Sequence, residues 1–205
     1  CFKQGEKMQQ LAWSVMSGKM VGIPALNTDT TSNKFCMSQA KDTNSICSSC
    51  YSWNMLQTFR KNAVPRFRKN SEIISKSLLA DNELPRPNGN TARFNGHGEI
   101  INTYHVQNIV KFALFYPKVT FTLWTKKKSL IQSFFRKHTK PSNLLLIFSN
   151  PTVGIIYKDV PKYFDKVFNV VEQDGDNVNC HGKCIDCMKC YDVSDNTKQI
   201  VEIIK

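Results

Sequence analysis

Residues 92–125 read ARFNGHGEIINTYHVQNIVKFALFYPKVTFTLWT, and this stretch decides the fold. Residues 92–95 fit a short strand, and residues 119–125 alternate apolar side chains with threonine, as a half-buried strand does. Residues 101–115 carry apolar side chains at helical spacing. Those side chains are Val106, Ile109, Val110 and Ala113. A strand, a helix and a strand of these lengths predict a right-handed crossover between parallel strands.

The same alternation continues toward the C-terminus. Residues 128–138 predict a second helix, residues 144–149 an apolar strand, and residues 167–171 a further strand. Because strands that alternate with helices form mainly parallel sheets, the predicted class is α/β. Two architectures fit: a small partial βα barrel (a half barrel), and an open, mainly parallel sheet with helices.

The chain before this pattern predicts helices and a polar loop. The expected helices span residues 4–20, 47–62 and 65–80, and the loop spans residues 27–33. A length of 205 residues predicts a single domain. We expect that domain, 1–205, to have three parts: a mainly helical part (1–90), a βαβ core (91–172) and a cysteine-rich, metal-binding C-terminal segment (173–205).

The composition is that of a globular chain with a basic surface. Lys and Arg number 28 against 16 Asp and Glu, the formal net charge is +12, and 41% of the residues are hydrophobic. No run of about 18 apolar residues occurs, which predicts no membrane-spanning helix and no membrane partner. Nothing resembles the apolar part of a secretory signal, so we expect a cytoplasmic protein.

Three basic patches predict contact with a polyanion. They cover residues 60–69, 126–128 and 136–140. Because phosphate contacts scale with the available Lys and Arg side chains, nonspecific nucleic acid is one expected partner. No recognition motif for DNA or RNA accompanies the charges. A solvated basic surface without a defined partner, or a small anion bound by residues 126–128, is the alternative.

Eight cysteines need an explanation, because a chain of this length can build a core without disulfides. They form two groups and one isolated residue. The groups are Cys36, Cys47 and Cys50, and Cys180, Cys184, Cys187 and Cys190, with Cys1 apart. Gaps of two or three residues bring sulfur atoms together on one turn, so the spacing predicts metal ligands. Disulfides or free thiols are the alternative.

The spacing fits two types of metal centre, an iron–sulfur cluster and a zinc ion. The tail, CHGKCIDCMKC, has the successive short gaps of 4Fe-4S proteins, in which the end cysteine of a run can ligate a second cluster. Three consecutive tail cysteines would then hold one cluster, and Cys180 or Cys190 would join the first group on another. The cluster with three thiolates would keep one iron open to a small ligand or to His181. One cluster alone, or zinc on four thiolates, would also fit.

Three loops follow predicted strands, at the edge where parallel sheets bind ligands. They span residues 95–99, 125–128 and 149–151. Glycine lets the backbone approach a ligand closely, and a carboxylate can act at the start of the next helix. The predicted ligand-binding residues are Gly96, Gly98, Thr125, Lys126 and Asn150, and the predicted catalytic residues are His97 and Glu99. In the alternative, the glycines only shape a turn and Glu99 only complements a helix N-terminus.

Two features together are similar to the radical S-adenosylmethionine superfamily. Cys180, Cys184 and Cys187 reproduce its three-then-two spacing, and the strand that runs into Gly98 and Glu99 is similar to its second strand. The layout more closely resembles a small phage-encoded family called gene product eighty-eight. The motifs are FC (35–36), CSSCY (47–51), RFNGHGE (93–99), FTLWTK (121–126) and a final CY (190–191). The resemblance implies an iron–sulfur protein.

The sequence therefore predicts a phage-encoded iron–sulfur protein with one or two 4Fe-4S clusters and redox or small-ligand chemistry at an open iron. The first alternative is a basic protein stapled by zinc or a cluster, which binds nucleic acid or another macromolecule. The second is a radical enzyme that binds S-adenosylmethionine. Whether the chain is an enzyme stays open at this point.

Overall fold

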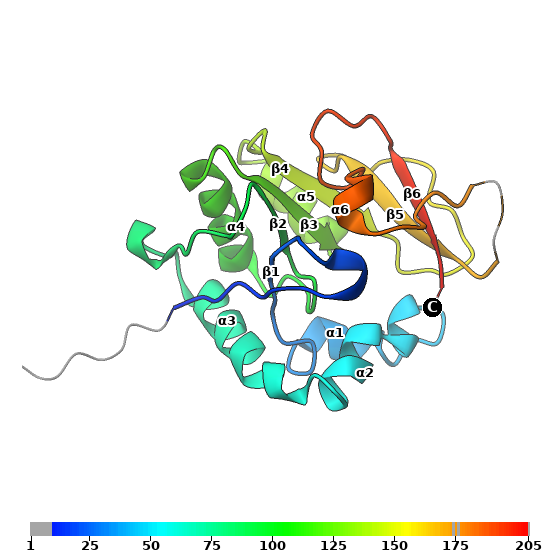
Figure 1. Ribbon diagram of the computed structural model, residues 1–205, viewed down its shortest axis with the longest axis horizontal. Helices are drawn as coiled ribbons and strands as arrows, with labels where there is room; N and C mark the ends of the chain where they lie inside the picture. The colour runs from blue at the N-terminus through cyan, green and yellow to red at the C-terminus, as the bar shows by residue number, and fades with distance from the viewer. Residues whose placement is uncertain (1–9, 174, 176, 205) are drawn as a thin grey trace, which may run out of the picture.

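The computed structural model describes residues 10–173, 175 and 177–204, and a six-stranded sheet forms its centre. Every strand pair is parallel, and the strands lie side by side in chain order (Figure 1). The predicted α/β class and the open parallel sheet are confirmed. The strands are β1 (Ala25–Leu26), β2 (Thr91–Phe94), β3 (Thr120–Thr125), β4 (Leu144–Ser149), β5 (Lys166–Val171) and β6 (Gln199–Ile203); the α-helices are α1 (Lys34–Gln39), α2 (Tyr51–Gln57), α3 (Val64–Lys76), α4 (Thr103–Phe115), α5 (Lys128–Phe135) and α6 (Cys184–Cys187); and the 3-10 turns are η1 (Gly18–Met20), η2 (Ile46–Ser49), η3 (Lys61–Ala63) and η4 (Asp81–Glu83).

One sheet unites the three parts that the sequence distinguishes. β1 comes from the N-terminal part, and Ala25 pairs with Arg93 of β2. β6 comes from the cysteine-rich segment, and Gln199 pairs with Val167 of β5. The tail that carries four cysteines is therefore attached to the sheet through its own strand.

The first face of the sheet carries the main apolar core. Neighbours across the strands share a face, so Phe94, Leu123 and Leu146 point to the same side. α4 and α5 lie behind the sheet in the view of Figure 1 and pack on this face. The helical residues of this core are Ile74, Val106, Ile109, Phe112, Ala113, Ile131, Phe134 and Phe135. The periodicity of residues 101–115 thus predicts the buried side of α4 correctly.

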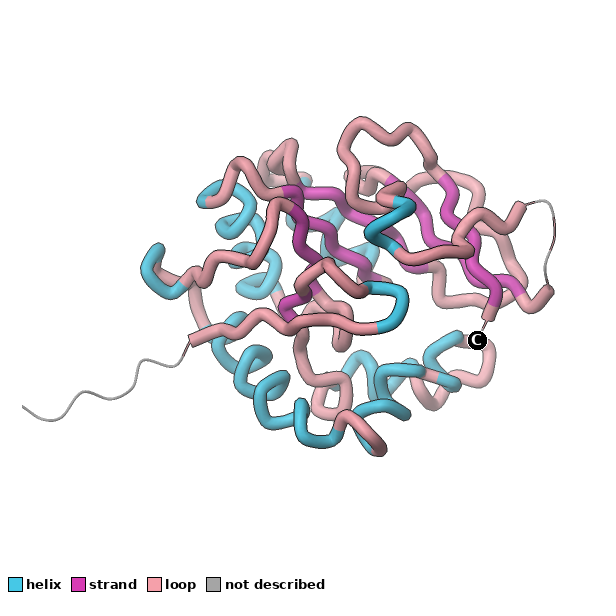
Figure 2. Tube along the Cα trace, in the orientation of Figure 1, coloured by secondary structure: helices cyan, strands magenta, loops and turns pink. Residues whose placement is uncertain are grey.

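The second face is covered mainly by irregular segments in the described part of the chain. The segment before β1 and the tail with α6 lie in front of the sheet, where Figure 2 shows mostly loop. η1 packs against α6, and the side chain of Ile185 lies against Gly22. The strand register points Arg93, Trp124 and Lys166 to this face. Charged side chains of the sheet therefore lie under the cysteine-rich tail.

The predicted helix over residues 4–20 is wrong where the structure describes it, and residues 4–9 lie outside the described part. Ser14 exchanges two backbone hydrogen bonds with Ala25, so the chain there is extended at the sheet edge. Val15, one of the apolar residues at helical spacing, is 95% exposed. Pairing with a distant strand outweighs the local helical pattern in this segment.

The predicted helix over residues 47–62 is also wrong, because η2, α2 and η3 replace it. Cys50 has extended backbone angles between η2 and α2, and Thr58 ends α2. The strands β1 and β6 and the helix α1 have no counterpart in the sequence prediction. β1 has two residues, and β6 includes Gln199 and Glu202, so neither shows a strong strand pattern.

Helix lengths in the described residues are modest. α3 and α4 have 13 residues each, whereas about 20 apolar residues cross a bilayer. Among the described helices, none combines the length and the apolar character that a membrane crossing requires.

Candidate functional site

The loops after β2, β3 and β4 meet at the carboxyl edge of the sheet, as predicted. Glu99 is 5% exposed and joins the first two loops. Its carboxylate accepts hydrogen bonds from Thr125 Oγ1 at 2.6 Å and from the backbone N–H of Lys126 at 2.8 Å. The backbone N–H of Ile100 donates a third at 2.7 Å. Lys126 Nζ donates to Ser149 Oγ at 3.1 Å, which adds the third loop.

The two glycines of the first loop approach the chain itself. A Cβ on Gly98 would collide with Thr28 Oγ1 and lie 2.6 Å from Thr28 O, and the φ of +86° at Gly98 favours glycine. A Cβ on Gly96 would lie 2.8 Å from Asn27 Oδ1. Both glycines therefore permit packing against the segment that follows β1, and the turn-shaping alternative accounts for them.

His97, a predicted catalytic residue, is buried in internal contacts. Its Nδ1 lies 2.8 Å from Ser52 Oγ, its Nε2 lies 3.4 Å from Arg60 Nη1, and its ring packs on Phe67. Burial lowers the pKa of His97 to about 4, and the nearby Arg60 and Arg93 charges contribute. The neutral imidazole thus joins α2 and α3 to the loop after β2.

Asn33 places the first cysteine of the N-terminal group. Its Oδ1 accepts hydrogen bonds from the backbone N–H groups of Phe35 and Cys36 and so caps α1. Its Nδ2 donates to the carbonyl of Glu99 at 2.9 Å. The cap therefore ties Cys36 to the carboxyl edge of the sheet.

Two further contacts place Cys47 and Cys50 at the same edge. The backbone N–H of Ile46 donates to the carbonyl of Pro151 at 2.7 Å, so η2 docks on the loop after β4. The hydroxyl of Tyr51 donates to a carbonyl in the loop after β2. η2 and the start of α2 thus lie beyond the carboxyl ends of β2 to β4. We call Cys36, Cys47 and Cys50 the edge group.

The edge group shares one electrostatic environment. Burial raises the pKa of Cys36, and Glu99, Cys47 and Cys50 raise it further, while Lys126 opposes them. Burial also raises the pKa of Cys47, again with Lys126 in opposition. The half-buried thiols of Cys36 and Cys47 are therefore protonated at neutral pH in the absence of a cation.

The other described cysteines, which we call the tail group, lie on the second face. Lys19 Nζ donates to Cys180 Sγ at 3.0 Å and to the carbonyl of Cys180 at 3.1 Å. α6 begins at Cys184 and ends at Cys187. Burial raises the pKa of Cys190 to about 12, and the thiols of Cys180 and Cys184 contribute. Cys187 is the exposed member.

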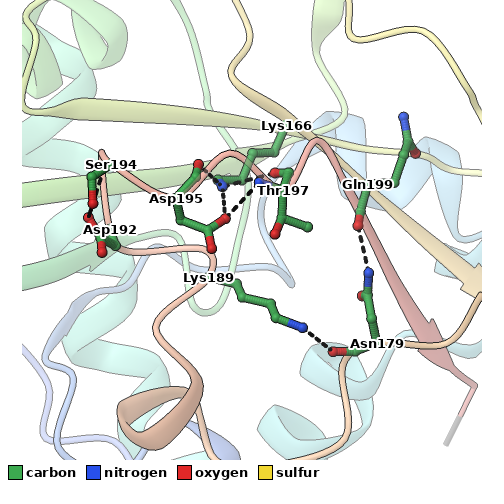
Figure 3. A network of polar contacts seen from close by, with 8 residues as sticks. All are labelled: Lys166, Asn179, Lys189, Asp192, Ser194, Asp195, Thr197 and Gln199. Carbon is green, nitrogen blue, oxygen red and sulfur yellow. Dashed lines mark hydrogen bonds and ion pairs between the residues drawn. The ribbon is translucent and has the colours of Figure 1, made fainter.

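Two anchors hold the tail group to the sheet, as Figure 3 shows. Lys166, 2% exposed at the start of β5, donates to Asp195 Oδ1 at 2.7 Å and to the carbonyl of Thr197 at 2.9 Å. The Asn179 side chain makes two hydrogen bonds, of 2.8 and 3.0 Å, to the backbone of β6. The anchors flank residues 180–190, so both ends of the cysteine segment are fixed.

Arg93 lies beneath the tail group on the second face. Its guanidinium carbon is 3.8 Å from the ring centroid of Trp124, and the buried ring of Tyr191 packs against the same indole. Arg93 Nε and the Tyr191 hydroxyl are buried and have no hydrogen bond of normal geometry among the described residues. Burial raises the pKa of Cys184, and the charge of Arg93 opposes that rise.

The basic patches predicted for nucleic acid are partly used inside the molecule. Lys127 Nζ donates to two backbone carbonyls before α4, and Lys128 Nζ donates to a tyrosine hydroxyl. Arg68 pairs with Asp29, and Lys140 pairs with Asp165. These contacts reduce the charge that each patch offers to a polyanion.

Two other predicted site residues have local contacts. Asn150 Nδ2 donates to the carbonyl of Ile155 at 2.7 Å and to Asn169 Oδ1 at 3.1 Å, which shapes the loop after β4. His181 is exposed, and its Nε2 lies 2.9 Å from the carbonyl of Val178.

The seven described cysteines are free thiols without disulfides. No three His, Cys, Asp or Glu side chains of residues 10–173, 175 and 177–204 lie as a ready-made metal-binding group. Because metal binding orders its own ligands, the fit rests on donor chemistry and charge. Thiols are suitable metal donors, and the cations beside them suit the negative charge of a metal–thiolate centre.

Lys19, Arg93 and Tyr191 are absent from the sequence prediction of the site. Arg93 could have been recognised from the sequence, because a charged residue inside a predicted buried strand needs a partner. Lys19 could not, since its contact with Cys180 spans 161 positions. No family model matches the chain, and neither a curated protein nor a solved structure shows detectable similarity to it.

Proposed function

We propose that this chain is an iron–sulfur protein whose edge group holds a cluster with one iron left open to a small ligand. The supporting observation is that the segments carrying three half-buried thiols dock at the edge where the β2, β3 and β4 loops meet. Parallel sheets bind ligands at this edge. Three thiolates also leave a four-site cluster one protein ligand short.

The residues around the edge group divide into holding and orienting roles. Cys36, Cys47 and Cys50 would hold the cluster, which when bound supplies electron transfer or a Lewis-acidic iron. Lys126 contributes a positive charge that opposes the repulsion between the thiolates. Glu99 keeps this lysine in place through its backbone N–H. An anionic or carbonyl-bearing small ligand suits the charge of Lys126.

The tail group has a different composition, and we propose a different role for it. Four thiols can saturate a zinc ion or a cluster, which leaves no open position. Its anchors, Lys166 and Asn179, fix it against the sheet rather than at a ligand-binding edge. A closed metal centre would stabilise the tail. The proposed setting is the cytoplasm, in a host cell if a phage encodes the chain.

Metal analysis of group-specific variants tests this proposal. The chain is purified without oxygen, and iron, acid-labile sulfide and zinc are measured with the visible absorption spectrum. We expect the triple variant Cys36→Ser, Cys47→Ser and Cys50→Ser to lose the iron and sulfide of the edge cluster, and to keep any metal that the tail group holds. The matched control is Cys1→Ser, which removes a thiol outside both groups and should retain them. Stoichiometric zinc without sulfide in the parent chain would overturn the iron–sulfur assignment.

A further inference from the structure

The charge of Arg93 has no anionic partner in the described residues. None of the ion pairs there includes it, and its side chain interacts with the Trp124 ring, the Met20 sulfur at 3.5 Å and the polar end of Tyr191. Arg93 is half-buried, and a partly desolvated charge without a partner is unfavourable. Its Nε is fully covered and makes no hydrogen bond of normal geometry among the described residues. The guanidinium therefore lacks a negative group at this position.

The polar side chains near this guanidinium are Tyr191, Tyr51 and Cys184, and none of them is a carboxylate. Of these, the thiol of Cys184 is the group that a metal ion deprotonates outright. Metal binding by the tail would create the missing negative charge beside Arg93.

A second cation meets the tail group from the other side. Lys19 Nζ donates to Cys180 Sγ at 3.0 Å, a contact that becomes stronger when the sulfur is a thiolate. The same lysine pairs with Glu202 of β6, which holds it in position. Lys19 and Arg93 come from different segments: Lys19 contacts the sulfur of Cys180, and Arg93 lies near Cys184.

The cations beside the tail group have the sign that a filled metal–thiolate centre requires. Four thiolates on a divalent zinc ion, or on an oxidised 4Fe-4S core, leave about two negative charges. Arg93 and Lys19, whose charge Glu202 partly offsets, would lower the cost of placing such a centre on the sheet. Three thiolates at the tail would leave one fewer negative charge.

We propose that Arg93 and Lys19 are the counter-charges of one metal–thiolate centre formed by Cys180, Cys184, Cys187 and Cys190. The inference rests on the proposed function, since it requires that the tail holds metal. It assigns Cys180 and Cys190 to the tail centre and leaves the edge group with three thiols. Arg93 acts as a positioning residue, because it touches no metal.

The test compares Arg93→Met with the parent chain in the metal-loaded and metal-free states. Methionine keeps an unbranched apolar side chain on Trp124 and removes the charge. We expect tail-metal affinity, measured by competition with a chelator, to fall about 10- to 100-fold. In the metal-free chain the urea midpoint should stay the same or rise, since an unpaired charge is removed. Lys137→Met removes an exposed cation of the turn after α5 and is the matched control.

The outcomes separate this inference from the proposed function. Weaker metal binding with an unchanged metal-free midpoint supports the counter-charge role, and Arg93→Lys should restore most of the affinity. A lower midpoint in the metal-free chain would mean that Arg93 only supports the fold. Unchanged affinity in Arg93→Met would overturn the inference and leave the iron–sulfur proposal standing. A parent chain that binds no metal would overturn both.

Discussion

The edge group and the tail group present similar thiols in different surroundings. The edge group lies beyond the carboxyl ends of the strands, between a carboxylate and a lysine, Glu99 and Lys126. The tail group lies on the second face, where Lys19 contacts the sulfur of Cys180 and Arg93 lies near Cys184. A mixed charge at a loop edge suits an exchangeable ligand, whereas two cations on a sheet face suit a permanently held anionic centre. Surroundings rather than spacing thus distinguish the two groups.

Replacing one glycine of each region with alanine should give the largest difference in stability. In Gly98→Ala the new Cβ meets the backbone of Thr28, and φ is +86°, so we expect a loss of about 4 kcal/mol in the free energy of unfolding. Gly182→Ala is the matched change in the tail, where a Cβ meets nothing within 4 Å. It should change stability by less than about 0.5 kcal/mol. Urea denaturation measures both, and equal effects would contradict the contrast.

Lys166→Met should loosen the tail group and spare the edge group. The change removes three hydrogen bonds to Asp195 and Thr197 from a side chain that is 2% exposed. We expect a loss of about 3 kcal/mol in unfolding free energy, together with faster alkylation of the tail thiols in the metal-free chain.

The control is Lys140→Met, which breaks the half-exposed pair with Asp165 and should cost about 1 kcal/mol or less. Faster alkylation of Cys36 in Lys166→Met would show that the two groups are not independently held.

Mild acid should act on the edge region through His97. Burial, followed by the charges of Arg60 and Arg93, lowers the pKa of His97 in the folded chain to about 4. In the unfolded chain this pKa has its ordinary value of about 6.5. Below pH 6.5 the unfolded chain therefore binds more protons than the folded chain does. The stabilising contribution is complete above pH 6.5 and declines as the pH falls toward 4. Between pH 7 and pH 5 we expect a loss of about 2 kcal/mol from this residue.

His97→Gln should reduce that pH dependence, because glutamine does not titrate. The unfolding free energy at pH 7 and pH 5 measures it. His138→Gln, at an exposed position, should behave as the parent chain does. His105, also buried with a pKa lowered to about 3 by burial and then by Lys127, contributes equally to every variant compared. An unchanged slope in His97→Gln would contradict the buried, neutral assignment.

Asn33→Ala should have the smallest effect, confined to the edge group. It removes the cap of α1 and the hydrogen bond to the carbonyl of Glu99, so about 1 kcal/mol of unfolding free energy should be lost. Hydrogen exchange at Cys36 and Phe35 should rise while exchange in the tail stays constant. Asn33→Asp keeps an acceptor and should retain most of the cap.

The sequence predicted the core elements because their signals are local. The spacing of Val106 and Ile109 marks the buried side of α4, and the alternation in residues 119–125 marks β3. Elements without a strong local pattern escaped prediction, such as the two-residue strand β1. Val15 misled the helix prediction, because apolar residues at helical spacing also occur in an extended segment that pairs with a distant strand.

The sequence by itself determined the α/β class, the two groups of cysteines and the edge where three loops meet, because these follow from short-range periodicity and from parallel strand geometry. Only the tertiary structure decided that Gly98 packs on Thr28, that His97 is buried and neutral, and that Lys19 contacts Cys180 while Arg93 lies near Cys184. Those contacts join residues far apart in the chain. They depend on how segments pack across the sheet, and no local pattern encodes that packing.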